Sequence, residues 1–268
     1  MKKIAALIDF TPTTAVVIEF VKNIALTQGA EVALVSIVEK GNVAQLKDAN
    51  ENMIPFCKVL TAANINCKIE IHEGGFFDIV GSVMDKLRAS LVIVGTHGKK
   101  GFKQNLFGSN ILKLVKIITA PCLIVQDDMV WPKNGLNTVL FPIASHSRFE
   151  MKINQTKDLV GKDGKFLLYA IYKTDMLDDQ LKNNIRLCQE TFVAQKVKYE
   201  LVEEDAQIYS VGFARQTLAY AEKHKVDMLS IMSQVAKDNK FFGNVDKENI
   251  ILNNLGIPVL CCNDDEIH

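Results

Sequence analysis

Hydrophobic residues in the first half of the chain follow two alternating spacings, and each spacing predicts one kind of element. Short continuous apolar runs are typical of buried strands, whereas apolar residues three and four positions apart are typical of helices. The expected strands are Lys3–Phe10, Glu31–Val38, Cys67–Ile71, Leu91–Val94 and Pro121–Gln126. Helical spacing fills the intervals between them. This alternation predicts a parallel sheet with helices on both faces.

Local signals mark where some of these helices begin and end. Thr11 followed by Pro12 is typical of a helix start, because proline at the first helical position gives up no hydrogen bond. Gly29 is typical of a helix end. The apolar positions from Phe76 to Leu87 predict a clearly amphipathic helix.

The second half repeats this pattern after a polar connection, Asp127–Gly135. Its expected strands are Asn137–Ile143, Lys165–Tyr172, Val197–Val202, Asp227–Met232 and Ile257–Cys262. Two pairs of matching positions, each 135 apart, are Ile4 with Val139 and Gly108 with Gly243. A nearly constant offset is typical of an internal duplication. The sequence therefore predicts two tandem five-stranded parallel-sheet α/β domains, at residues 1–130 and 136–268.

Composition and charge argue against several classes of function. The chain has 268 residues, 48% hydrophobic and 23% charged, as in soluble globular proteins. Its 31 basic residues balance 31 acidic ones, which argues against a dedicated binder of nucleic acid or membrane surface. The run Ile4–Phe10 is short and interrupted by Asp9, so we expect a strand there, not a signal peptide. No apolar run approaches the roughly 18 residues of a membrane span.

Six cysteines show no Cys-x-x-Cys spacing of a metal site, and most lie in apolar stretches. We therefore expect reduced, buried thiols in a cytoplasmic protein. The adjacent residues Cys261 and Cys262 would point to opposite faces of a strand, and a redox role for this pair stays open.

The stretch from Leu91 to Ser109 carries the clearest chemical signal. An apolar strand leads into a glycine-bearing loop, and helical spacing resumes at Ile111. Ser109 stands where a helix N-cap belongs, and the free N–H groups of a helix start attract anions. Three lysines and no acidic residue lie between His97 and Ser109. The alternatives are an anion-binding loop and a plain turn between strand and helix.

The glycine spacing of this loop resembles the ATP-binding signature of the universal stress protein family. That signature is Gly-x-x-Gly, nine residues, Gly-Ser, and it falls here on Gly95, Gly98, Gly108 and Ser109. The whole duplicated chain is similar to tandem members of the family. The resemblance implies an adenine nucleotide alpha hydrolase-like fold in each half. It implies ATP as the ligand, with AMP or ADP as alternatives, and Mg²⁺ held mainly through the phosphates.

Further residues enter the predicted site through this resemblance. Thr96, His97 and Asn110, which flank the signature glycines, belong to the same cofactor-binding set. Ile8 and Ile37 would line the adenine pocket, although a strand isoleucine is by default a core residue. His97 could also cap the loop backbone or face water.

Asp9 ends the first strand, and it would face the loop if the first and fourth strands are neighbours. Two roles are open for its carboxylate. It can cap the helix that begins at Pro12, or it can accept hydrogen bonds from the two hydroxyls of a ribose. In universal stress proteins the matching acid contacts the ribose, and the resemblance implies the same contact here.

The second half lacks this constellation. The replacements are Ala144 for Asp9, Met232 for Gly95, Val235 for Gly98 and Asn244 for Ser109. The loop that leads to Gly243 is also shorter. Side chains at Met232 and Val235 would occupy the space that a phosphate needs. We therefore predict one nucleotide per chain, bound in the first half.

Hydrolysis requires a positioned water, charge neutralisation and usually a metal. Near the loop the sequence offers no acidic pair, no arginine and no candidate base beyond Asp9 and His97. We expect no catalytic residue, no protein-held metal and at most a slow ATPase. The favoured function is a cytoplasmic stress-response protein with ATP as a regulatory ligand. The alternatives are an interaction scaffold of the same fold and an enzyme that uses an adenylated or flavin intermediate.

The last strand of each half, Pro121–Gln126 and Pro258–Asn263, is short and apolar and would lie at a sheet edge. Universal stress proteins commonly dimerise through this strand. The resemblance therefore implies an intrachain pseudo-dimer of the two halves. A further homodimer and a protein partner, which the sequence does not name, stay open.

Overall fold

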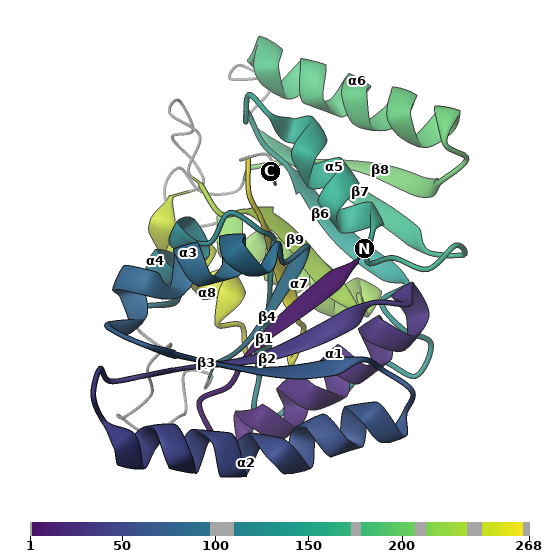
Figure 1. The fold of residues 1–268 in the computed structure, drawn as a ribbon. Coiled ribbons are helices and arrows are strands. Elements are labelled where there is room, and N and C mark those ends of the chain that lie inside the picture. The colour runs from purple at the N-terminus through teal and green to yellow at the C-terminus, as the bar shows by residue number, and fades with distance from the viewer. Residues whose placement is uncertain (1, 97–109, 173–177, 207–212, 235–242, 265–268) are drawn as a thin grey trace. The chain divides into compact units, whose positions relative to one another are not determined.

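The computed structural model describes residues 2–96, 110–172, 178–206, 213–234 and 243–264, and Figure 1 draws their helices and strands. The chain divides into two units. Unit 1 is Met1–Trp131 and unit 2 is Pro132–Asp264.

In unit 1, strands and helices alternate along the described chain. The elements are β1 (Lys3–Leu7), α1 (Thr13–Gln28), β2 (Glu31–Val38), α2 (Val43–Ala62), β3 (Cys67–Glu73), α3 (Phe76–Leu87), β4 (Leu91–Thr96), α4 (Ile111–Ile117) and β5 (Cys122–Gln126). Successive strands are all joined through helices, which is the connection that parallel strands require.

The strands of unit 1 are parallel and follow the order β3-β2-β1-β4-β5. Ile4 of β1 pairs with Val32 of β2 on one side and Leu91 of β4 on the other. The chain thus builds outward from β1 to β3 and then crosses over to β4. In open parallel sheets, ligands bind beyond the carboxyl ends of the strands at such a reversal. The predicted pairing of the first and fourth strands is confirmed.

Helices cover both faces of the unit 1 sheet. Figure 1 shows α1 and α2 on one face and α3 and α4 on the other. The four apolar residues Leu91–Val94 of β4 are fully buried, because both faces of this central strand are covered. Burial on both faces explains why the strand is a continuous apolar run without polar alternation. No described helix is both long and apolar enough to cross a bilayer.

Unit 2 repeats the order of elements found in unit 1. Its elements are β6 (Thr138–Ile143), α5 (Phe149–Lys157), β7 (Lys165–Tyr172), α6 (Asp179–Ala194), β8 (Lys198–Asp205), α7 (Phe213–His224), β9 (Met228–Met232), α8 (Asn244–Ile251) and β10 (Val259–Cys262). The strand order β8-β7-β6-β9-β10 is that of unit 1, and all pairs are again parallel. The predicted fold class, a duplicated five-stranded parallel α/β fold, is confirmed.

Most predicted strands differ from those of the structure by one to three residues at one end or both. The first helix, α1, begins at Thr13, with Pro12 as its N-cap residue and not as its first helical residue.

Two of the differences bear on the site. β1 ends at Leu7, not Phe10, because the backbone turns there: Phe10 has φ 59°, a left-handed value that no strand residue adopts. The helix after the glycine loop begins at Ile111 with Asn110 as its N-cap residue, so the predicted N-cap position of Ser109 is wrong by one residue.

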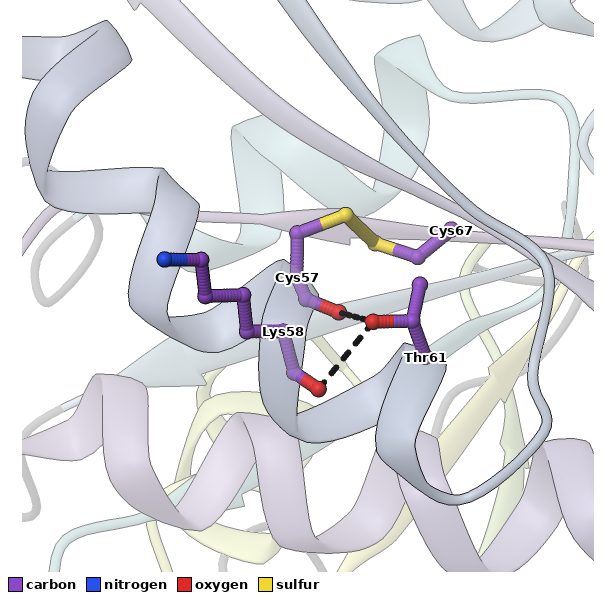
Figure 2. The surroundings of a disulfide bond; sticks show 4 residues. All are labelled: Cys57, Lys58, Thr61 and Cys67. Atoms are coloured by element: carbon purple, nitrogen blue, oxygen red, sulfur yellow. Dashed lines mark hydrogen bonds between the residues drawn. A yellow bond between two sulfur atoms is a disulfide. The ribbon is translucent and has the colours of Figure 1, made fainter.

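The expectation that all six cysteines are reduced is wrong for two of them. Cys57 in α2 and Cys67 at the start of β3 form a disulfide, with their Cα atoms 5.7 Å apart (Figure 2). Ten positions of sequence separate them, but the helix, the turn and the strand bring the side chains together. The other four cysteines are free and buried, as expected: they are Cys122, Cys188, Cys261 and Cys262.

Candidate functional site

A pocket of about 510 Å³ opens beyond the carboxyl ends of β1 and β2 in unit 1. Most small-molecule sites have volumes of a few hundred cubic ångströms. Its walls come from the residues after β1, the end of β2, the first half of α2 and the turn between β3 and α3. The lining residues are Leu7, Ile8, Asp9, Phe10, Val35, Ser36, Ile37, Val38, Glu39, Gln45, Asp48, Ala49, Asn52, Gly74, Gly75 and Phe76. The pocket thus borders β1, the strand at which the strand order reverses.

Asp9 combines a structural contact with an available oxygen. Its Oδ1 accepts hydrogen bonds from the backbone N–H of Thr11 at 3.1 Å and from the Thr11 hydroxyl at 2.7 Å. The hydroxyl of Thr14 also lies 3.5 Å from Oδ1. These contacts hold the turn before α1, whereas the N-cap position of the helix belongs to Pro12, so the helix-capping role that the sequence left open is not realised. The other carboxylate oxygen, Oδ2, makes no hydrogen bond to any residue that the structure describes.

Phe10, directly after Asp9, holds a backbone conformation that costs free energy. A φ of 59° is uncommon for a residue with a Cβ atom. The turn at Phe10 redirects the chain from the end of β1 to the start of α1. Asp9 is thereby placed in the pocket wall. Nothing in the sequence pattern predicted this turn conformation.

The inner wall of the pocket is apolar and its rim is polar. Ile8 is buried and Ile37 half-buried, and both line the pocket, as the resemblance implied. Gln45, Asp48 and Asn52 lie on the exposed side of α2 and add polar groups. These three residues were missed because they read as a solvated helix face. Their position in the chain could have predicted them, because α2 follows β2 and therefore starts at the same end of the sheet as Asp9.

Hydrogen bonds fix the connection between β2 and α2 that borders the pocket. The backbone N–H of Glu39 donates to Oε1 of Gln45 at 3.0 Å, and the N–H of Gly41 donates to Glu73 at 2.8 Å. Asn42 caps α2 by accepting from the N–H of Gln45 at 3.1 Å. These hydrogen bonds therefore hold the connection between β2 and α2 in one conformation at the pocket rim.

The pocket lining is acidic. Asp9, Glu39 and Asp48 contribute carboxylates, and the lining contains no lysine, arginine or histidine. Such a lining favours groups that donate hydrogen bonds, such as hydroxyls and amines, and repels a phosphate. A ligand that carries both hydroxyl or amine groups and a phosphate would therefore place its phosphate outside this pocket.

At the end of β4, Gly95 serves helix packing. A Cβ atom on Gly95 would lie 2.8 Å from Cγ2 of Thr13 and 3.0 Å from Cγ2 of Val17. The group that approaches the strand end closely is therefore α1. Thr96 is buried at the last position of β4, and Asn110 is exposed before α4.

The structure gathers some of the predicted site residues and leaves others apart. Ile8, Asp9 and Ile37 meet in one pocket. Gly95, Thr96 and Asn110 are not among its lining residues. The remaining four, His97, Gly98, Gly108 and Ser109, lie outside the described residues.

In unit 2, buried cations occupy the corresponding end of the sheet. Lys152 is 1% exposed, and its ammonium donates to the carbonyl oxygen of Pro142 and lies 4.0 Å from the centre of the Phe141 ring. Burial lowers the pKa of Lys152 to about 7, although the thiols of Cys262 and Cys188 oppose this shift. Lys152 lines, together with Ala144, a small cavity at the carboxyl end of β6.

Lys247 and His146 fill the same region. Nζ of Lys247 donates to the carbonyl oxygen of Met232 at 2.7 Å and to that of Gln234. Burial, with the nearby charges of Lys247 and Lys152, lowers the pKa of His146 to about 3, so its ring is neutral at pH 7. The cavity lined by Ala144, His146 and Lys152, among others, measures about 10 Å³. That is room for about one water molecule.

The described residues contain no group of three or more histidine, cysteine, aspartate or glutamate side chains placed to hold a metal ion.

Comparison with known families assigns the first half of the chain. The family model described as "Universal stress protein family" matches residues 1–126. These residues belong to the universal stress protein family. The match ends with β5, so it spans the whole of the unit 1 sheet. No curated protein matches the chain.

Solved universal stress proteins extend the likeness to the whole chain. One from Archaeoglobus fulgidus is 14% identical, covering 97% of this chain and 96% of its own, with a TM-score of 0.71. A protein proposed to be a universal stress protein in Pseudomonas aeruginosa is 12% identical, covering 100% and 95%, with a TM-score of 0.63. A universal stress protein in complex with cAMP is 16% identical and covers 47% of this chain and 98% of its own, with a TM-score of 0.40. The two full-length matches show that the second half also has the universal stress protein fold.

Proposed function

We propose that this protein binds an adenine nucleotide, with ATP as the main ligand, in its first half, as a regulatory ligand in a cytoplasmic stress response. The observation that carries the proposal is Asp9, whose second carboxylate oxygen stands in the wall of a 510 Å³ pocket without a described protein partner. A carboxylate placed beside β1 in this way suits the two hydroxyls of a ribose.

The proposed nucleotide is arranged by the charges around the pocket. Its ribose donates to Asp9 and its adenine packs between Ile8 and Ile37, which line the apolar wall. The acidic lining directs the phosphates away from the pocket, toward the end of β4 and the residues that follow it. Gly95, Thr96 and Asn110, with the signature residues His97, Gly98, Gly108 and Ser109, are the proposed phosphate contacts. AMP and ADP would share the nucleoside part of the site.

Hydrolysis is not part of the proposed role. The pocket lining carries no lysine, arginine or histidine to neutralise charge that develops on a transferred phosphoryl group. We propose that any ATP turnover stays well below the ~1 s⁻¹ of slow ordinary enzymes. Any Mg²⁺ would be held through the phosphates and water.

The second candidate is an interaction scaffold without a nucleotide. One observation favours it: unit 2 has the same fold although Lys152 and His146 leave a cavity of only about 10 Å³ beside Ala144, the counterpart of Asp9, so the fold does not require a ligand at that position. The retention of Asp9 with a large pocket in unit 1 favours the nucleotide.

Substitution of Asp9 tests the proposal. We expect Asp9→Ala to weaken ATP binding by about 1–3 kcal/mol, because charge-assisted hydrogen bonds to the ribose are lost. Isothermal titration calorimetry on the full chain measures this. Asp9→Ala also removes the contacts to Thr11, so Thr11→Ala is the matched control, and it should bind ATP as the natural protein does. Equal affinities for the natural protein and Asp9→Ala would contradict the assignment of Asp9.

A further inference from the structure

The disulfide joins two segments that otherwise meet only through packing. Cys57 lies in the second half of α2 and Cys67 is the first residue of β3. Both are half-buried. In Figure 2 the two side chains meet across the space between the helix and the strand, beside Thr61. The Thr61 hydroxyl donates to the carbonyl oxygens of Cys57 and Lys58, so it turns back onto its own helix and not toward the bond.

α2 buries few side chains for its length. Of its twenty residues only Ala49, Met53 and Leu60 are buried. Pro55 stands inside the helix and has no N–H to donate to the carbonyl of Glu51, which weakens the helix between its two halves. The covalent bond at Cys57 therefore adds to the buried side chain of Leu60 in holding the second half of α2 against the sheet.

Both segments that the disulfide connects also line the pocket. Gln45, Asp48, Ala49 and Asn52 come from α2. Gly74 and Gly75 directly follow β3. Cys57 is five positions beyond Asn52, which in a helix is about 7 Å along the axis. Cys67 is seven positions before Gly74, which in a strand is about 23 Å. The bond thus ties the two segments together at the end that lies away from the pocket.

Exposure makes this pair the first target of a thiol reagent. The other four cysteines are free and have 0% exposure each. The Cys57–Cys67 pair is only half-buried. A disulfide in a protein that works in a reducing compartment is usually transient and senses redox state.

We propose that Cys57 and Cys67 form a redox site that controls the pocket of unit 1. A dithiol attacks the bond through its thiolate, forms a mixed disulfide with one cysteine and releases the other as a thiol. The second thiol of the dithiol then attacks the mixed disulfide, so that the dithiol forms an internal disulfide and the remaining cysteine is released as a thiol. The dithiol loses two electrons and two protons, and the protein gains both. Reduction frees the second half of α2, and the pocket loses one fixed wall.

The first test identifies the site. The full chain is treated with dithiothreitol without denaturant, alkylated with N-ethylmaleimide and mapped by peptide mass spectrometry. Labelling of Cys57 and Cys67 only after reduction, with the other four cysteines unlabelled, supports the proposal. Labelling of this pair without reduction, or equal labelling of all six, overturns it.

The second test measures the coupling to the pocket. Hydrogen–deuterium exchange should become faster in α2 on reduction while exchange in α1 stays constant. Unchanged exchange in α2 would overturn the proposal. A double variant, Cys57→Ser with Cys67→Ser, should exchange like the reduced chain under both conditions. Lys58→Ala, an exposed neighbour on the same helix, should respond to reduction as the natural protein does.

The third measurement is the ATP affinity in the two redox states. It rests on the proposed function, because it requires that the protein binds ATP, and its outcomes distinguish a failure of that function from a failure of the redox control. ATP affinity should fall about tenfold on reduction, a coupling of ordinary size. Measurable binding that is equal in both redox states contradicts the redox control. Absence of ATP binding in both states contradicts the proposed function instead, and the exchange of α2 then decides the redox control.

Discussion

At the scale of single residues, the two units use the same end of the sheet in opposite ways. Unit 1 places the carboxylate of Asp9 there and leaves one of its oxygens without a described partner. Unit 2 places the buried ammonium of Lys152 there, 135 positions after Val17, which in unit 1 packs near Gly95. A small apolar side chain has thus been replaced by a long cationic one that reaches the carbonyl of Pro142.

Burial of Lys152 should cost stability in a way that depends on pH. Its pKa is about 7 in the folded chain and 10.5 as a free side chain, so between these values the unfolded chain binds more protons. The free energy of unfolding should therefore rise with pH across this window. Below about pH 7 both states carry the proton and the full cost is present.

Lys152→Met should stabilise the protein by about 1–3 kcal/mol at pH 6, because an apolar side chain of similar length needs no partner. The gain should be smaller at pH 9. Urea unfolding at the two pH values measures both differences, and Lys162→Met, at an exposed position of unit 2, is the control with an expected change near zero. A loss of stability in Lys152→Met at pH 6 would contradict this account of the buried lysine.

At the scale of elements, the sequence predicts the central strands well and the pocket rim poorly. The residues Leu91–Val94 form a continuous apolar run because β4 is covered on both faces, so its pattern is unambiguous. The pocket face of α2 was missed because Gln45, Asp48 and Asn52 have the spacing of an ordinary solvated helix face. Only the parallel arrangement of β1 and β2 shows that these side chains share an end of the sheet with Asp9.

Other features follow from three-dimensional geometry that no local pattern encodes. The turn after β1 depends on a left-handed Phe10, whereas glycine is the residue that signals such a turn. The disulfide depends on the angle at which α2 returns to β3, and neither cysteine belongs to a recognisable motif. The place of Asp9 in the pocket wall was easier to predict from the sequence, because a carboxylate at the end of the first strand lies at the carboxyl end of the sheet, where ligands bind.

At the scale of the whole molecule, duplication leaves two units with one fold, and unit 1 holds a pocket of about 510 Å³. Within unit 1 the strand order ends at β5, and within unit 2 at β10. The sequence predicts that the halves pair through these strands as an intrachain pseudo-dimer, and this pairing stays a prediction. If unit 2 serves as the pairing partner of unit 1, its fold would be kept even though it lacks the residues of the nucleotide site.

A fragment of residues 1–135 tests the pairing. It keeps Trp131, whose ring packs 5.2 Å from that of Phe20 in α1. An uncovered β5 should make the folded fragment dimerise, because an exposed strand edge invites pairing. Sedimentation velocity measures its mass, and circular dichroism confirms its folding. A folded fragment that stays monomeric at tens of micromolar would argue against pairing through β5.

The central claim is one adenine nucleotide per chain, bound in unit 1. Calorimetric titration of ATP into the full chain tests it most directly, with Ala144→Asp as a second sample. Restoring this carboxylate should add no site, since Lys152, His146 and Met232 still line a cavity of only about 10 Å³. We predict one site per chain in both proteins, with a Kd below about 1 mM. Two equivalent sites in the natural protein, or no binding of ATP, ADP or AMP at millimolar concentration, would contradict the account.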